Sequence, residues 1–129
     1  MRAIRFNSEY GPALVNADAV TAVSQADTCH EAGVTLSFRD GGELEVDGDF
    51  DAVVSALAAV LRLPDDRPCG LVAFEGWADR GMCAVSPRAV DFVTPSGIDR
   101  VCDIDTGFSE TRVVGTFEEV VAKLTGGAP

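Results

Sequence analysis

The sequence is poor in lysine and histidine. Lys123 is the only lysine and His30 the only histidine, and arginine supplies nine of the ten Lys and Arg side chains. Against 21 acidic residues this leaves a net charge of −11. Such a charge repels phosphate backbones, so no binding to duplex nucleic acid is expected. The acidity either keeps the chain soluble or attracts a basic protein partner.

Long apolar runs are also missing. No segment approaches the roughly 18 apolar residues of a membrane span, and residues 1–6 alternate apolar with basic side chains, unlike a signal peptide. We therefore expect a cytoplasmic protein without membrane contact. No Cys-x-x-Cys pair occurs, which argues against a zinc knuckle or redox dithiol. In a reducing compartment all four cysteines should be free thiols: Cys29, Cys69, Cys83 and Cys102.

Catalytic motifs are absent as well. Cys29 and His30 are adjacent, but neighbouring residues on an extended chain point in opposite directions, so they do not make a nucleophile and its base. No glycine-rich phosphate loop occurs, and Asp47, Asp49 and Asp51 lack the closing glutamate of a calcium loop. The sequence therefore predicts no enzyme, no metal site and no cofactor.

An internal repeat organises what is present. Ala13–Val23 aligns with Cys83–Val93, and Val46–Leu57 aligns with Val113–Leu124 with six identities in twelve positions. Length differences fall in turns, as expected for a duplicated fold. The predicted organisation is a first repeat over 1–63, a proline-containing linker over 64–68 and a second repeat over 69–126.

Each repeat reads as several strands followed by a helix. In the first, period-2 alternation predicts strands at residues 2–6, 14–15, 19–23, 34–38 and 43–46, with a glycine turn inside a hairpin over 34–46. Asp49 should cap a closing helix, and Thr116 with Glu119 should form a capping box on its counterpart. Phe50 and Phe117 are expected in equivalent buried positions.

The predicted fold class is α+β: two tandem β-meander-plus-helix repeats packed about a pseudo-two-fold axis. A unit of about 60 residues is marginal alone, so we expect one compact domain with the two sheets either joined at their edges or facing each other. With 47% hydrophobic residues the chain has enough apolar material for that core.

The pattern Ala13-Leu-Val-Asn16, Ala19–Val23, Val34–Phe38, Gly41-Gly42 and the Phe50 to Leu57 helix resembles the FlbD-like small flagellar proteins. The resemblance covers the first repeat well and the second loosely, because Ser86-Pro87 replaces Asn16-Ala17. It implies a small accessory or binding protein and identifies no functional residue.

Two functions are predicted on this basis. The first is a non-catalytic binding or assembly protein, of inhibitor or accessory type, that acts on a protein partner; Trp77 and Arg80 would form its binding hot spot. The second is sequestration or sensing of a small anionic ligand such as a nucleotide, held between repeats or between subunits of a homo-oligomer. Trp77 or Tyr10 would stack on it, and its arginines would be Arg39, Arg80, Arg88, Arg100 or Arg112.

Overall fold

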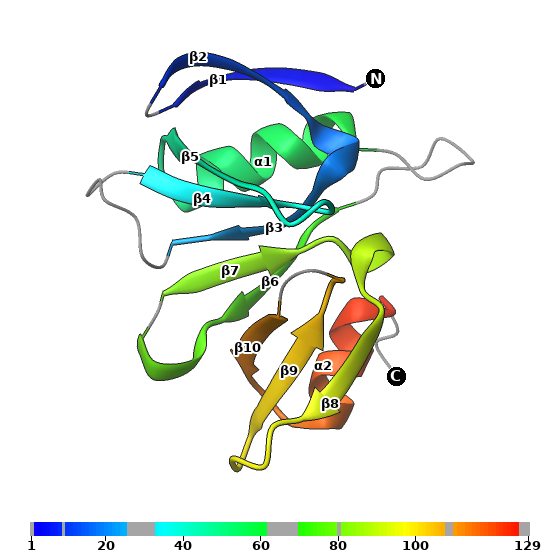
Figure 1. The fold of residues 1–129 in the computed structure, drawn as a ribbon. Helices are drawn as coiled ribbons and strands as arrows, with labels where there is room; N and C mark the ends of the chain where they lie inside the picture. The colour runs from blue at the N-terminus through cyan, green and yellow to red at the C-terminus, as the bar shows by residue number, and fades with distance from the viewer. Residues whose placement is uncertain are drawn as a thin grey trace.

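The computed structural model describes residues 2–8, 10–25, 33–61, 70–79, 81–107 and 110–126. They form ten strands, two α-helices and three short 3-10 helices, which confirms the α+β class (Figure 1). Neither described helix is long and apolar enough to cross a membrane. The predicted linker over 64–68 lies outside the described residues.

The first half contains five strands and a helix: β1 (Ala3–Ser8), β2 (Gly11–Asn16), η1 (Ala17–Ala19), β3 (Val20–Ser24), β4 (Gly33–Phe38), β5 (Glu43–Asp47) and α1 (Phe50–Val60). The predicted hairpin is confirmed, with Val34 opposite Val46. Its turn is closed by Asp40, whose carboxylate accepts from the Gly42 N–H at 2.9 Å. Asp49 caps α1 by accepting from the Ala52 N–H at 2.8 Å, as expected from the sequence.

The second half also has five strands and a closing helix, with one additional 3-10 helix, η2, after its first strand: β6 (Val72–Glu75), η2 (Trp77–Asp79), β7 (Met82–Val85), η3 (Pro87–Ala89), β8 (Phe92–Pro95), β9 (Val101–Asp105), β10 (Glu110–Val114) and α2 (Phe117–Leu124). The capping box predicted at Thr116 and Glu119 is present at the start of α2.

The strands form two hydrogen-bonded sheets. Seven strands follow the order β2-β1-β5-β4-β3-β7-β6, and three follow the order β10-β9-β8. A single pair, Ser8 opposite Val46, joins β1 to β5, and one bridge, Gly76 opposite Val113, links the end of β6 to β10. The sheet orders place β2, β6, β8 and β10 at sheet ends, and because that bridge joins β10 to the residue after β6, β2 and β8 are the described end strands with no residue pair on their outer side.

The two halves meet where β3 pairs with β7. Ala22 lies opposite Val85, Val23 opposite Ala84 and Ser24 opposite Cys83. Because successive side chains alternate between faces, Val23 and Ala84 face the core that packs on α1, whereas Val85 and Cys83 belong to the core of the second half. One stretch of sheet thus serves two cores on opposite faces.

This junction does not agree with the expected pseudo-two-fold axis. A two-fold relation would bring the same strand of each half together, or show every contact twice in reciprocal form. The observed junction joins the third strand of the first half to the second strand of the second half. The halves therefore meet through strands that differ in their order along the chain, and two strands of the second half, β6 and β7, extend the sheet of the first.

The expectation for the two phenylalanines was wrong in one half. Phe50 is 5% exposed, but Phe117 is 40% exposed. Leu71, Ala73 and Ala84 from the second half pack against the core that contains Phe50. The described residues around the second core all come from the second half, so nothing comparable covers Phe117.

Truncating the two phenylalanines should therefore give unequal results. We expect Phe50→Ala to lower the free energy of unfolding by about 3–5 kcal/mol, because it opens a cavity in a packed core. Phe117→Ala should cost about 1 kcal/mol or less, because its ring is partly solvated already. Urea titrations monitored by circular dichroism test this, and equal losses would contradict the asymmetry.

Candidate functional site

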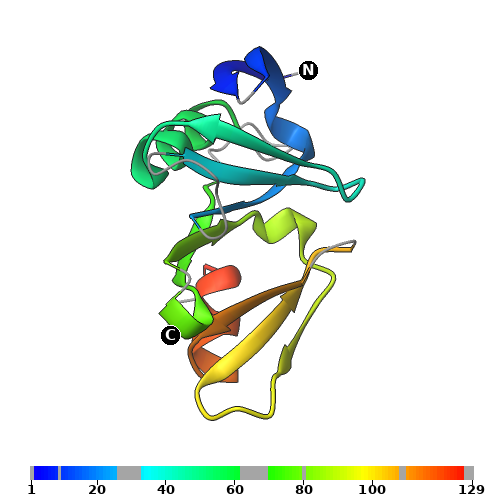
Figure 2. The same cartoon turned by 60° about the vertical axis from the view of Figure 1, so that its left-hand side comes forward.

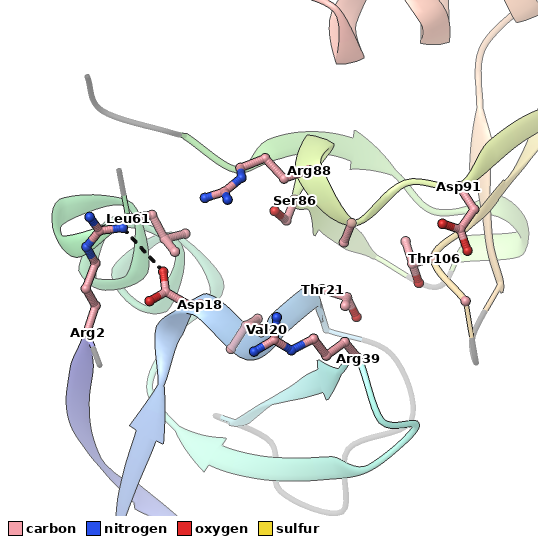
Figure 3. A pocket seen from close by; sticks show the side chains of 12 residues that line it. Arg2, Asp18, Val20, Thr21, Arg39, Leu61, Ser86, Arg88, Asp91 and Thr106 are labelled. Atoms are coloured by element: carbon pink, nitrogen blue, oxygen red, sulfur yellow. Dashed lines mark hydrogen bonds and ion pairs between the residues drawn. The ribbon is translucent and has the colours of Figure 1, made fainter. Parts of the chain in front are cut away.

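An open pocket of about 590 Å³, lined by residues of both halves, lies beside the β3–β7 junction (Figure 3). Its charged lining residues come from both halves: Arg2, Asp18 and Arg39 from the first, Arg88 and Asp91 from the second. It brings together two of the predicted binding residues, Arg39 and Arg88. Arg2 was not predicted, because nothing in the sequence places the first strand beside η3.

Arginines outnumber acids in this lining by three to two, in a protein whose net charge is −11. Arg2 Nη1 lies 3.5 Å from Asp18 Oδ1, a partly exposed pair of small energetic weight. Arg39 follows β4, where its N–H donates to the Ala19 carbonyl at 3.0 Å, and its side chain forms no ion pair with another described residue. Guanidinium groups in such a cleft suit a small anion.

Trp77 lies away from this pocket. It is 36% exposed, and the Arg112 guanidinium lies 5.3 Å from the centre of its ring. Arg112 also donates to both oxygens of Asp103, at 2.8 and 3.4 Å, and this hydrogen bonding raises the pKa of Arg112. The aromatic ring thus packs on β10 of its own half. Arg80, its predicted companion, lies outside the described residues.

The backbone of this turn is constrained. Ala78 has φ 61 and ψ 43, a left-handed conformation that few residues other than glycine adopt. Gly76 donates to the Gly81 carbonyl at 2.8 Å and forms the bridge to Val113. The turn therefore holds Trp77 beside β10 while the residue stays 36% exposed, so its predicted binding role stays a prediction.

Tyr10 and Arg100 lie at two separate turns. Tyr10, between β1 and β2, is 85% exposed. Arg100, between β8 and β9, bonds to Glu119 at 3.1 Å, and its carbonyl accepts from the Gly115 N–H at 2.7 Å. Capping hydrogen bonds from Thr116, and then the charge of Arg100, lower the pKa of Glu119. Arg100 thus fastens its turn to the start of α2.

The two described thiols are not nucleophiles. Cys83 and Cys102 are free and buried, and they donate to the carbonyls of Phe74 and Gly115. Burial raises the pKa of Cys83 to about 11 and also raises that of Cys102, so both are protonated at neutral pH. Cys29, His30 and Cys69 lie outside the described residues. In the part of the chain that is described, no three potential metal ligands cluster.

The most exposed apolar side chains inside strands were not predicted as site residues. Leu14 on β2 is 63% exposed and Phe92 on β8 is 53% exposed. These are the two described end strands with no residue pair on their outer side, and they lie in different halves of the molecule (Figures 1 and 2). A signal existed in the sequence, because the aligned positions in the other half, Ala84 and Ala22, are small.

Comparison with protein-family models, with curated proteins and with solved structures found no match for this chain. The functional proposal therefore depends on the residues and geometry described above.

The raised pKa of Cys83 predicts a loss of stability at alkaline pH. Below about pH 9 the thiol is protonated in both states, so it adds no pH dependence. Between the ordinary pKa of 9.0 and the folded value of about 11, the unfolded chain loses the proton while the folded chain keeps it. At about pH 10.5 this should lower the free energy of unfolding by on the order of 1–2 kcal/mol.

Urea unfolding of the wild type and of Cys83→Ala at about pH 8 and pH 10.5 measures this effect, since other titrating groups are common to both proteins. The wild type should lose more stability than the variant between the two pH values. Parallel losses would show that Cys83 is not the responsible group.

Proposed function

We propose that this protein is a non-catalytic binding protein that joins a protein partner through the free edges of its sheet. The observation that carries the proposal is the placement of Leu14 and Phe92, two large exposed apolar side chains, on β2 and β8. An edge strand presents unpaired N–H and C=O groups, which pair with an added strand while the alternate side chains supply specificity.

The composition of these strands supports this role. Proteins commonly protect an edge with charged side chains, yet neither Gly11–Asn16 nor Phe92–Pro95 contains a charged residue, although 24% of the chain is charged. The strands of the internal junction, β3 and β7, are also free of charge. Each free edge does contain one proline, Pro12 or Pro95, which has no N–H to donate and shortens the stretch that can pair.

We also propose that the two halves are tandem copies of one unit, as the sequence alignment indicates. Apart from η2, both have the same order of elements, and in both one residue pair, Ser8–Val46 or Gly76–Val113, links the end of the first strand to the last strand. Aligned glycines before each helix, Gly48 and Gly115, have φ of 125 and 149. Aligned core positions are buried in both halves: Val15 and Val85, Val34 and Cys102, Leu36 and Ile104, Val46 and Val113, Val53 and Val120.

Other properties agree with a binding role. The described thiols are protonated and inaccessible, and the net charge of −11 favours a basic partner. A cytoplasmic setting, which would keep the thiols reduced, and an accessory function of the kind implied by the resemblance to FlbD-like proteins belong to the same proposal.

The edges can be tested with three lysine variants. Leu14→Lys and Phe92→Lys place a charge on each free edge, and Ile98→Lys, at a 41% exposed apolar residue in the β8–β9 turn, is the matched control. Partners captured by the wild type are identified by mass spectrometry and their affinities measured with purified proteins. We expect one or both edge variants to bind about tenfold or more weakly and the control to bind normally. Unchanged affinity in both edge variants would refute the proposal.

The pocket between the halves supports a second candidate function, binding of a small anion. Arg39 and Arg88 converge there with Arg2, whereas Trp77 and Tyr10 are not among its lining residues. The supporting contacts would thus be guanidinium to phosphate, without aromatic stacking.

Calorimetric titration with ADP and with inorganic phosphate tests this candidate. Arg39→Ala should abolish binding, and Arg39→Lys should weaken it because an ammonium group cannot make the planar two-pronged contact. Arg100→Ala is the control, since Arg100 pairs with Glu119 away from the pocket. No heat of binding in the wild type, or equal binding by all variants, would exclude the pocket.

A further inference from the structure

We propose that the partner of these edges is a second copy of this chain, bound head to tail so that β8 of one molecule pairs with β2 of the next. The inference rests on the proposed edge function and on the proposed tandem repeat. Each molecule would offer β8 to one neighbour and β2 to another, so that copies of the same chain would occupy both edges.

The template for this contact is the junction between β3 and β7 within one molecule. In the alignment of the halves, β8 is the counterpart of β3, and β2 is the counterpart of β7. Each molecule therefore uses one such junction internally. It carries the two matching surfaces, unused among the described residues, in its two different halves.

The register follows from the internal junction by substitution. Each residue of the internal junction is replaced by its aligned counterpart in the other half. The internal pairs are Ala22–Val85, Val23–Ala84 and Ser24–Cys83. The corresponding pairs between two molecules are Phe92–Val15, Val93–Leu14 and Thr94–Ala13. The hydrogen bond from Ser86 N–H to the Thr21 carbonyl, 2.9 Å long, becomes one from Asn16 N–H to the Asp91 carbonyl. Three residue pairs of an antiparallel ladder would thus be repeated between molecules.

Differences in burial between the halves agree with a missing neighbour. Ala84 and Ala22, within the internal junction, are 0% and 5% exposed, whereas their counterparts Leu14 and Phe92 are 63% and 53% exposed. The core is affected in the same way. Val23 and Leu57 are fully buried, while their counterparts, Val93 and Leu124, are half-buried.

These deficits have a common cause. The second half supplies Leu71, Ala73 and Ala84 to cover the first core, and nothing described covers the second core in the same way. In a head-to-tail pair, Leu14 on β2 of the next molecule would take the place that Ala84 has in the internal junction. The larger side chain would fill space beside the half-buried Val93 and Leu124.

Two prolines limit the length of the contact. Just beyond the three internal pairs, Gln25 N–H donates to the Met82 carbonyl at 3.1 Å, and Met82 N–H donates to Gln25 Oε1 at 2.6 Å. Pro95 and Pro12 occupy the aligned positions, and proline has no N–H to donate. The intermolecular ladder therefore stops at three pairs and lacks these two bonds, which makes the association weaker and fixes its register.

The contact joins two different surfaces, so it does not close on itself as a two-fold dimer does. Repetition yields a ring if the rotation between molecules closes, or a filament if it does not. Because every copy carries a charge of −11, repulsion opposes assembly, and added salt should strengthen it by screening.

Sedimentation velocity with two single-edge variants tests the arrangement. In about 0.5 M NaCl the wild type should associate in a concentration-dependent manner. Leu14→Lys and Phe92→Lys should each be monomeric alone, because each has lost one of the two complementary surfaces. An equimolar mixture should form a 1:1 dimer and nothing larger, since only β8 of the first and β2 of the second remain intact. Ile98→Lys should assemble as the wild type does.

Every other pattern overturns the inference. Self-association of either edge variant alone would indicate β2–β2 or β8–β8 pairing, and a monomeric mixture would show that the edges do not bind each other. Circular dichroism and thermal unfolding of each variant verify that the fold is intact. A monomeric mixture, together with loss of an external partner in the same variants, would refute self-assembly and leave the proposed edge function standing.

Disulfide trapping tests the register independently, in a chain with Cys29 and Cys69 replaced by serine. Thr94→Cys and Ala13→Cys proteins, when mixed, should form a mixed disulfide, because these positions would face each other in a non-hydrogen-bonded pair with close side chains. Thr94→Cys mixed with Leu14→Cys, one residue out of register, should cross-link at least tenfold more slowly. Equal rates would contradict the proposed register.

Discussion

The pairing of β3 with β7 is the contact on which the rest of this structure depends. Only three residue pairs form it, yet it carries the sheet from one half into the other and divides its two faces between two cores. Val23 and Ala84 close the first core, and Val85 with Cys83 closes the second. Neither half has the same protection without it, since a single sheet with one helix buries too little apolar surface on its own.

Charge is distributed unevenly among the strands, although charged strands pair as well as uncharged ones, as β4 with β5 and β9 with β10 show. Acidic and basic side chains occupy the outward-facing positions of β5, β9 and β10, where Asp103 and Arg112 pair across the strands. The strands β2, β3, β7 and β8 have none. With β4, a protein so acidic as a whole thus keeps five uncharged strands, of which β3, β4 and β7 are paired on both sides within the molecule and β2 and β8 have a free edge.

Several local predictions were confirmed because they depend on neighbouring residues alone. The Asp49 cap, the Thr116–Glu119 capping box and the hairpin between Val34 and Val46 are each specified by short-range chemistry. The burial of Phe117 was not predictable in this way. Phe117 has the same position in its helix and the same spacing of apolar neighbours as Phe50. The two differ in exposure because strands of the other half cover Phe50 and none of the described strands covers Phe117 in this way. Trp77 is similar, since its contact with Arg112 depends on where β10 lies.

The sequence by itself determined the order of strands and helices in each half, the helix caps, the turns and the alignment between the halves, because periodicity and capping act over a few residues. Only the tertiary structure decided which strand edges meet, because edge pairing involves residues far apart in the chain and any uncharged strand is a chemically suitable partner for another. That choice joined the third strand of the first half to the second strand of the second half and put Arg39 and Arg88 on one pocket. It also left Leu14 and Phe92 on two free edges, where backbone groups and apolar side chains are available to a further strand.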